Sequence, residues 1–453
     1  IAYFYYNSEL IFVAILAIIF SMPTYPFIEK KLTNPKFLVF RYSGIIAMLV
    51  ICITYIAAGS IALATIANAQ SLFVEDPNED QGESLPIQYS LTAGLGYDDY
   101  FTSSENSEGT TSIYANAALG ANYVNAKPQT TWKVGAYLSA NKYFEDERSG
   151  SGVYYNARLN LDVNHRINDR TRFVSQNYIS YGIEPDYSFS FTPDRAPVEH
   201  LFYSLDNAIG HRWTSRLATY TGVRVRGVDY HGGNRDDDRL TYGIYNNFRY
   251  SLNTTTVLTA NLSYNETDAS GSAGDATDIT GSLGLERRLS SRSYMNAKVG
   301  VTRRDVDGGR GSYYNPYVSA ALNTNVNSQL SLRTFVRYGV ENYGTSQGIN
   351  TYDTNQALRI GLSANYTVSP KLSLNAGVNY IRYDYSDGRN VVANTAISDA
   401  DRDLINPYVG FTYRVNDRTS INGSYNYTDS SSSGFSANDF SRNRVQLGVT
   451  RIF

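Results

Sequence analysis

Residues 87–453 follow a two-residue hydrophobic period that is interrupted by short and long polar breaks in strict alternation. Short breaks of Asn, Asp, Ser and Thr recur about every 37 to 47 residues, a hairpin-sized internal repeat. They lie at 125–129, 168–170, 214–215, 253–254, 290–291, 327–328, 369–370 and 416–417. Long breaks rich in Gly, Asp and Ser lie at 98–110, 144–151, 184–198, 230–238, 268–276, 306–311, 343–353, 386–400 and 430–438. Together these breaks separate eighteen segments, each about 12 to 15 residues long.

Within each segment the two faces differ in polarity. In 371–380 one face carries Leu372, Leu374, Ala376, Val378 and Tyr380, and the other carries Ser, Asn and Gly. A period of two with a polar partner face is typical of a strand with one apolar environment. Because a tilted strand crosses a bilayer in about 9–11 residues, every segment is long enough to span a membrane.

The last strand of the pattern ends on an aromatic residue. Val445, Leu447, Val449 and Phe453 share one face, as in the closing strand and C-terminal assembly signal of bacterial outer-membrane β-barrels. We therefore predict an all-β fold, a transmembrane antiparallel up-and-down β-barrel of about 18 strands (16–18) with short periplasmic turns and longer extracellular loops. Closure would pair the strand near 88–97 with the last strand and leave no sheet edge. The alternative is a soluble sandwich or β-helix, in which strands of this length are rare.

Tyrosines cluster near the ends of the segments. We expect them to form an interfacial girdle, made of Tyr97, Tyr100, Tyr143, Tyr181, Tyr230, Tyr343, Tyr383 and Tyr385.

The composition fits a closed sheet better than a thick soluble core. Hydrophobic residues are 42% and aromatic residues 13% of the chain. The sole cysteine, Cys52, lies in the N-terminal apolar segment, which excludes disulfides, thiolate metal sites and cysteine nucleophiles from the barrel. A net charge of −3 gives no reason to expect nucleic acid as a partner.

Residues 1–69 are predicted to be a signal peptide and an upstream segment. An apolar run at 44–66 follows a basic cluster and precedes Ala67-Asn68-Ala69, a small-residue cleavage site. The length of that run would also suit an uncleaved anchor. Residues 70–86 then form an acidic periplasmic leader, and 87–453 form the outer-membrane β-barrel.

A barrel of this size can enclose water, since sixteen to eighteen strands leave an aqueous channel. The sequence thus predicts a porin-like channel for passive diffusion of small hydrophilic solutes. Basic residues on the expected inward faces are the candidate pore lining: Arg158, Arg224, Arg226, Arg249, Arg333 and Arg337. They either hydrate the wall or form basic ladders that favour anionic solutes.

The third long break, 184–198, is the candidate constriction loop. It has three prolines, several aromatic residues and the acidic side chains Glu184, Asp186 and Asp194. Acids opposite wall arginines would create a transverse field in a narrow pore. An ordered surface loop packed on its own aromatics is the alternative.

The hairpin periodicity, the loop start Glu184-Pro185-Asp186-Tyr187 and the terminal Phe453 give the chain a resemblance to the β-barrel porin type-2 family. Some members of that family accompany exopolysaccharide or exosortase systems. The resemblance thus implies an alternative function, a barrel associated with exopolysaccharide export or a cell-surface system, or a structural or adhesive outer-membrane protein.

No catalytic, cofactor or metal site is predicted. Of the four histidines only His231, near Asp229 and the acids Asp236, Asp237 and Asp238, sits where a rim protease would need it. The acidic groups 236–238 and Asp399, Asp401 and Asp403 have oxygens that could bind Ca²⁺, but a solvated acidic loop explains them as well. The expected partners are outer-membrane lipid and lipopolysaccharide, the barrel-assembly machinery through Phe453, and small solutes or a glycan. A homo-oligomer is compatible with this reading.

Overall fold

The computed structural model describes residues 85–101, 110–144, 152–183, 199–231, 238–270, 274–307, 311–342, 346–347, 350–390, 392–434 and 439–453. The expected signal peptide and nearly all of the leader lie outside the described residues. So does the expected constriction loop, with Glu184, Asp186 and Asp194.

The described residues form twenty β-strands. These are β1 Leu85–Phe101, β2 Thr110–Ala126, β3 Thr130–Tyr143, β4 Val153–Asn168, β5 Thr171–Gly182, β6 Glu199–Arg212, β7 Leu217–His231, β8 Arg239–Asn253, β9 Thr256–Ala269, β10 Ala276–Ser290, β11 Ser293–Val306, β12 Ser312–Asn325, β13 Leu330–Val340, β14 Ser346–Gln347, β15 Asn350–Ser369, β16 Leu372–Asn390, β17 Thr395–Ala396, β18 Ala400–Asn416, β19 Thr419–Ser433 and β20 Phe440–Ile452.

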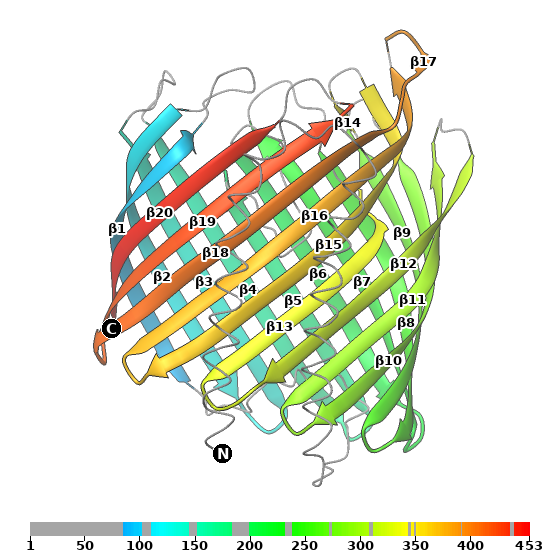
Figure 1. Ribbon diagram of the computed structural model, residues 1–453. Coiled ribbons are helices and arrows are strands. Elements are labelled where there is room, and N and C mark those ends of the chain that lie inside the picture. The colour runs from blue at the N-terminus through cyan, green and yellow to red at the C-terminus, as the bar shows by residue number, and fades with distance from the viewer. Residues whose placement is uncertain are drawn as a thin grey trace.

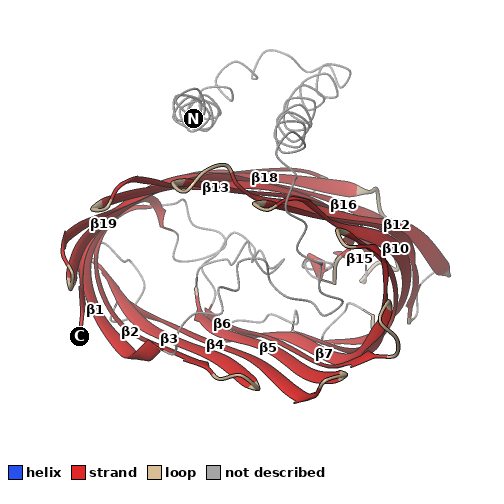
Figure 2. Ribbon diagram, turned by 90° about the horizontal axis from the view of Figure 1, so that it is seen from below, coloured by secondary structure: helices blue, strands red, loops and turns tan. Residues whose placement is uncertain are grey.

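The sheet closes on itself into a barrel (Figures 1 and 2). Each long strand pairs antiparallel with the long strands before and after it, and β1 pairs with β20 from Ser90↔Ile452 to Asp98↔Arg444. Strands β14 and β17 have two residues each and extend the connections before β15 and after β16. The wall therefore has eighteen strands, which confirms the predicted fold class and strand number. No helix among the described residues is long and apolar enough to cross a membrane.

The two ends of the barrel differ in the length of their connections. At one end, hairpins turn within a few residues, and most turns are closed by a side chain that accepts backbone N–H groups. Asn327 Oδ1 accepts from the backbone N–H of Gln329 and of Leu330, both at 2.8 Å, and Thr214 Oγ1 accepts from Arg216 and Leu217. The predicted short breaks are thus confirmed as turns, and the local side-chain bonding expected of Asn, Ser and Thr explains why they stop the strands. We call this the short-turn end and the opposite one the long-loop end.

The seam of the barrel is the pairing of β1 with β20, and its short-turn end includes the last residue of the chain. The backbone N–H of Phe453 donates to the carbonyl oxygen of Tyr89 at 2.9 Å, so the last residue is part of the ladder. The ring of Phe453 is exposed on the outward face, and the Arg451 guanidinium lies 5.5 Å from its centroid. This contact allows the arginine to remain on the outward side at the strand end.

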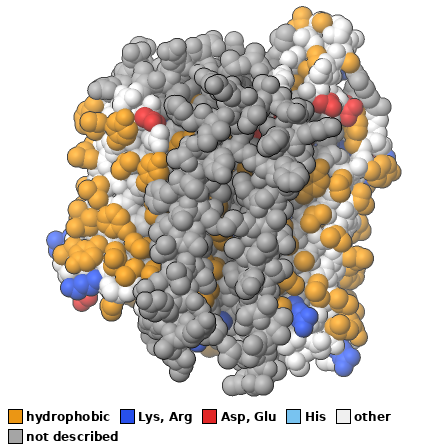
Figure 3. All heavy atoms as spheres, viewed as in Figure 1, with side chains coloured by type: hydrophobic (Ala, Val, Ile, Leu, Met, Phe, Trp, Pro, Cys, Tyr) orange, Lys and Arg blue, Asp and Glu red, His pale blue; other side chains and the backbone are white. Residues whose placement is uncertain are grey.

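The outward face is apolar along most of its height. Large exposed residues such as Leu95, Leu283 and Val299 project from the convex side. In Figure 3, hydrophobic side chains cover the described wall, and charged ones gather toward its upper and lower ends. Alternate residues of the same strands are polar and point to the interior, so the barrel is apolar outside and polar inside.

The expected tyrosine girdle is only partly correct. Tyr97 is exposed on the outward face, but Tyr143, Tyr383 and Tyr385 are almost completely buried and lie on the inward side. The error is one of parity, because a shift of one residue moves a side chain to the other face of a strand. Exposed outward aromatics do occur at both ends: Tyr155, Tyr242, Tyr264 and Tyr314 toward the long loops, and Trp132, Trp213, Tyr250 and Tyr413 toward the short turns.

Candidate pore lining and constriction

Hydrogen bonds that skip a strand identify the inward face. Tyr245 on β8 donates to Asp206 on β6 at 2.6 Å, and Gln446 on β20 donates to Asn116 on β2 at 3.4 Å. Side chains converge on the concave side of a curved sheet and diverge on its convex side, so such contacts belong to the interior. The strand register then assigns the other residues to the inward or outward face, since residues directly opposite on paired strands share a face.

By this criterion, all six candidate pore-lining arginines lie on the inward side of their strands. Their surroundings, however, divide them into two groups. In the first group the guanidinium is held by an acid. Arg224 donates to Asp206 through Nε at 2.9 Å and Nη2 at 2.6 Å, and its charge also lies 5.0 Å from the ring of Tyr245. Its neighbour Arg226 donates to Ser204 at 3.3 Å.

Arg249 is the most enclosed of the six. It makes two 2.6 Å hydrogen bonds to the carboxylate of Glu286, which also accepts from Tyr294 at 2.8 Å. The side chains of Arg249 and Glu286 are 2% and 9% exposed. A pair this well enclosed braces β8 against β10 across β9 and adds little net field to the lumen.

The second group presents its charge to the interior. Arg158 and Arg333 are exposed, and neither has a hydrogen-bond or ion-pair partner among the described residues. Arg337 is half-buried and stands directly opposite Arg359 of β15. Two like charges in register repel each other, so the acid that holds Arg359 matters for this part of the wall.

That acid belongs to a segment that sequence reasoning had missed. Glu341 follows the last residue of β13, and its carboxylate accepts from Arg359 Nε at 2.7 Å and Nη2 at 2.8 Å. Arg359 also donates to the hydroxyl of Tyr383 at 2.7 Å. The side chains of Arg359 and Glu341 are 4% and 3% exposed, so this ion pair is shielded from solvent.

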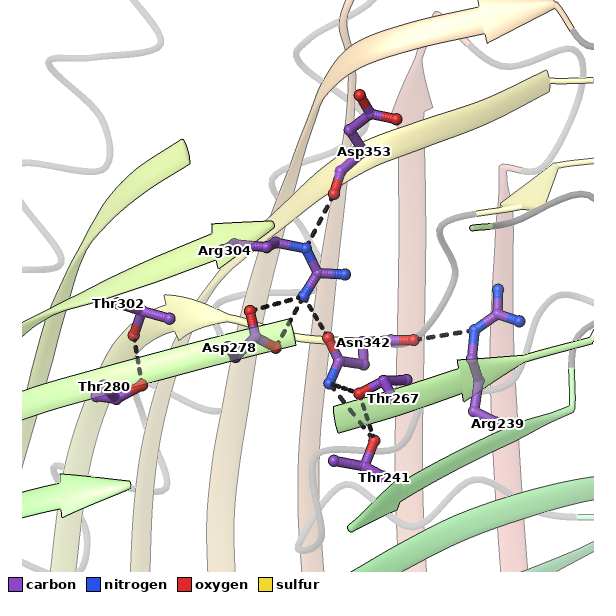
Figure 4. A network of polar contacts seen from close by, with 9 residues as sticks. All are labelled: Arg239, Thr241, Thr267, Asp278, Thr280, Thr302, Arg304, Asn342 and Asp353. Carbon is purple, nitrogen blue, oxygen red and sulfur yellow. Dashed lines mark hydrogen bonds and ion pairs between the residues drawn. The ribbon is translucent and has the colours of Figure 1, made fainter. Parts of the chain in front are cut away.

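The next residue, Asn342, reaches a different part of the wall (Figure 4). Its amide donates to Thr267 of β9 at 2.8 Å, and its amide oxygen accepts from Arg304 of β11 at 2.5 Å. Its backbone oxygen accepts from Arg239 of β8 at 3.3 Å. Glu341 therefore holds β15 on one side, and Asn342 holds β8, β9 and β11 on the other. We call these two residues the strap.

Arg304 is the main attachment point for the strap. It donates to Asp278 at 3.0 Å and, through Nε, to the backbone oxygen of Asp353 at 3.0 Å. Arg304 and Asp278 are 4% and 7% exposed. Figure 4 shows Asn342 between Arg304 and the threonine pair Thr241 and Thr267. The strap thus joins wall segments that are not neighbours in the sheet, at the long-loop end of the interior.

Toward the short turns the inward face has a different character. Basic side chains follow one another around the wall, and we call them the basic collar: Lys133, Arg166, Arg172, Arg212, Arg288, Lys298, Arg333 and Arg414. Inward acids on the same half of the described strands are Asp162, Asp206 and Glu286, and the last two are bound to Arg224 and Arg249. This half of the interior is therefore net positive.

The sequence does not single out most of the collar, because several of its members, such as Arg166, Arg172 and Arg212, stand next to turns. Turn-flanking arginines and lysines are commonly solvated and carry no signal of their own. Only the register shows that they share the inward face. Arg333 is the one member that the sequence predicts, because it lies on an alternating strand.

Of the histidine and aspartate groups, Asp236 and Asp237 lie outside the described residues. His165 bonds to Thr130 and His211 to Thr171 near the short turns, whereas His200 is buried near the long loops. Asp401 and Asp403 both accept from Arg382. In the part of the chain that the structure describes, no group of three or more His, Cys, Asp or Glu side chains could hold a metal ion.

Comparison with known proteins gives one partial match by sequence. Residues 296–453 match the family described as "Putative beta-barrel porin 2", so the resemblance inferred from the sequence is confirmed over that segment, which is less than half of the chain. None of the curated proteins matches the chain.

Among solved structures, the chain is similar in fold to outer-membrane channels of low sequence identity. Pseudomonas aeruginosa OpdK with vanillate shares 11% identity at a TM-score of 0.43, covering 81% of this chain and 99% of that one. A BenF-like porin from Pseudomonas fluorescens Pf-5 shares 14% identity at a TM-score of 0.43, covering 82% and 100%. Acinetobacter baumannii OccAB4 shares 12% identity at a TM-score of 0.39, covering 83% and 100%. The barrel itself is established by the strand pairing, and by sequence residues 296–453 are similar to the β-barrel porin 2 family.

Proposed function

We propose that this protein is a channel of the bacterial outer membrane through which small hydrophilic solutes diffuse passively, with a preference for anions. The observation that carries the proposal is a closed eighteen-strand barrel whose outward face is apolar and whose inward face is polar. Closure gives the backbone N–H and C=O groups of every strand a hydrogen-bond partner and leaves no sheet edge, as a sheet in hydrocarbon requires.

The lumen supports passage rather than a filled core. Barrels of sixteen to eighteen strands are too wide for wall side chains to fill. Here the inward side chains include exposed Arg158 and Arg333 and many Asn, Ser and Thr residues, all of which can exchange hydrogen bonds with a hydrated solute. The porin match over residues 296–453 supports the same function.

The preference for anions rests on the basic collar. Fixed charge around a pore selects ions of opposite sign, and inward bases outnumber inward acids on the short-turn half of the described strands. Arg224 contributes less to the positive charge of the pore than the sequence suggests, because the Asp206 carboxylate lies 2.6 Å from its guanidinium.

The proposal assigns no catalytic role to the chain. The histidines that the structure describes contact threonines or aromatic neighbours. A periplasmic short-turn end, a cleaved signal peptide, recognition of Phe453 by the assembly machinery, and contact with lipopolysaccharide all remain parts of this proposal.

Polysaccharide export receives no support from four buried tyrosines near the long loops. Tyr114 and Tyr143 lie 5.0 Å apart, and Tyr352 and Tyr385 lie 5.5 Å apart. All four are at most 4% exposed, so their rings pack on one another and are not available for stacking on a sugar.

Reconstitution into liposomes tests the proposed passage of solutes. We expect vesicles containing the refolded protein to swell in iso-osmotic solutions of small neutral and anionic solutes, and to swell more slowly as solute size increases. Swelling rates equal to those of protein-free vesicles would refute a diffusion channel. Release of a polysaccharide without entry of small solutes would favour export instead.

A further inference from the structure

At mid-height, the outward face carries a cluster of polar side chains on four neighbouring strands. On β5 to β8 the middle of the lipid-facing surface includes Ser175, Asn177, Asn207, Thr221 and Asn246, which we call the outer amide patch. Register places them on the same side as exposed Ile209, Val223 and Ile244. Among the described strands, no others place an asparagine in the middle of the outward face, and the hydroxyl of Thr334 on β13 is the nearest equivalent.

The patch lies between apolar rows and not at a rim. On β6, Asn207 has Leu205 above it and Ile209 below it, and on β8, Asn246 lies between Ile244 and Phe248. If the barrel spans a membrane, as proposed above, these amides face hydrocarbon. There, an amide without a partner is costly.

Hydrogen bonds within the patch are incomplete. Asn207 donates to Asn177 at 3.5 Å, Asn177 donates to Ser175 at 2.7 Å, and Asn246 donates to Thr221 at 2.7 Å. Three asparagines have six amide N–H donors, and these three bonds use half of them. The amide oxygen of Asn246 also has no hydrogen-bond partner. The patch therefore retains donors that only an external group can satisfy.

We propose that the outer amide patch is the interface at which two copies of this chain associate in the membrane. An amide is both donor and acceptor, so the patch is complementary to itself. A two-fold axis brings the same surface of each subunit together. Polar side chains are known to hold membrane segments together in this way.

The shape of the barrel suits this arrangement. Viewed along its axis the barrel is a flattened ring, with β4 to β7 along one long side and β13, β16 and β18 along the other (Figure 2). A flat side lets several strands of each copy meet at once, whereas a strongly curved side would allow contact along one strand only. Because β5, β6 and β7 lie on this flat side, the part of the patch on these neighbouring strands can be buried as a unit.

Cysteine cross-linking tests the interface in an otherwise unchanged chain. The sequence has no cysteine beyond Cys52, so Asn207→Cys introduces the one thiol of the barrel. We expect oxidation of this variant in lipid vesicles to yield a disulfide-linked dimer. Val299→Cys, on the exposed outward face of β11, is the matched control and should remain monomeric. Equal cross-linking of the two variants, or none at Asn207→Cys, would refute the interface.

Removing the amides tests their energetic role. We expect Asn177→Leu, Asn207→Leu and Asn246→Leu together to weaken dimerisation by roughly tenfold or more, as measured by native mass spectrometry or by dilution in lipid. The barrel should stay folded, since leucine suits a lipid-facing position. Thr334→Val is the control and should leave the dimer unchanged. Wild-type protein that is monomeric but still conducts would overturn the proposed interface and leave the proposed channel intact. The interface would also be overturned if the patch were found bound to a different protein or to lipopolysaccharide in place of a second copy.

Discussion

The two halves of the lumen differ in the balance of basic and acidic side chains. Near the long loops, arginines are paired with acids and shielded from solvent: Arg359 with Glu341, and Arg304 with Asp278. Near the short turns, the collar has more bases than acids, and Arg333 is exposed without a partner among the described residues. An arginine held by an acid, such as Arg359 or, in the short-turn half, Arg249, holds strands together, whereas an exposed arginine such as Arg333 sets the charge of the pore. Residue type alone does not distinguish these roles, but the distance to the nearest acid does.

The largest effect is expected from breaking the buried pair at the long-loop end. Glu341→Ala leaves the Arg359 charge enclosed opposite Arg337, and loss of one partner of a buried pair costs about 3–5 kcal/mol. Urea unfolding in lipid vesicles, followed by tryptophan fluorescence, should show a clearly lower midpoint. Arg333→Met is the control from the other half and should change stability by about 0.5 kcal/mol or less. Equal losses of stability in Glu341→Ala and Arg333→Met would contradict the distinction between the two halves.

A smaller effect is expected from the second residue of the strap. Asn342→Ala removes hydrogen bonds to Thr267 and Arg304, at a cost of about 1–3 kcal/mol because the buried partners are left unsatisfied. Release of the strap should also increase the current fluctuations of single channels. Asn261→Ala removes an inward amide of β9 that has no hydrogen bond among the described residues, and should alter neither property. An Asn342→Ala channel with the stability and the current fluctuations of the wild type would show that the strap does not constrain the lumen.

The sequence predicted the wall well because the wall depends on local rules. Two-residue alternation, turn-forming Asn and Ser, and a terminal aromatic are all properties of short segments, and they gave the eighteen strands and the closing pair. Strand lengths at the long-loop end were less accurate. β16 continues to Asn390, beyond the break expected at 386, and within this extension Asp387 adopts a positive φ of 57°.

The strap and the collar depend on what distant segments place side by side. Asn342 contacts Thr241 and Thr267, which lie more than seventy residues away in the chain, and no spacing in the sequence relates them. Likewise, Asp206 and Arg224 become a pair only through the register of β6 and β7. Candidate arginines could be found by alternation, but their partners could not.

The smallest effect concerns selectivity and tests the collar directly. The double variant Arg166→Glu with Arg333→Glu reverses two collar charges. It should lower the ratio of anion to cation permeability by roughly threefold or more at low salt. The difference should fade near 1 M salt, where the Debye length is about 3 Å. The paired change Asp206→Asn with Arg224→Gln removes one charge of each sign, so it should leave the ratio unchanged. A shift in the paired variant equal to that in the collar variant would mean that pairing does not cancel the field of Arg224.

The most direct test of the account is the current through the wild-type protein in a planar lipid bilayer under a salt gradient. We predict steady conductance with a reversal potential on the side of the anion equilibrium potential, because water-filled passage and net positive collar charge are its two central elements. A protein that inserts as a folded barrel but carries no current would contradict the channel. A reversal potential on the cation side would contradict the role given to the collar.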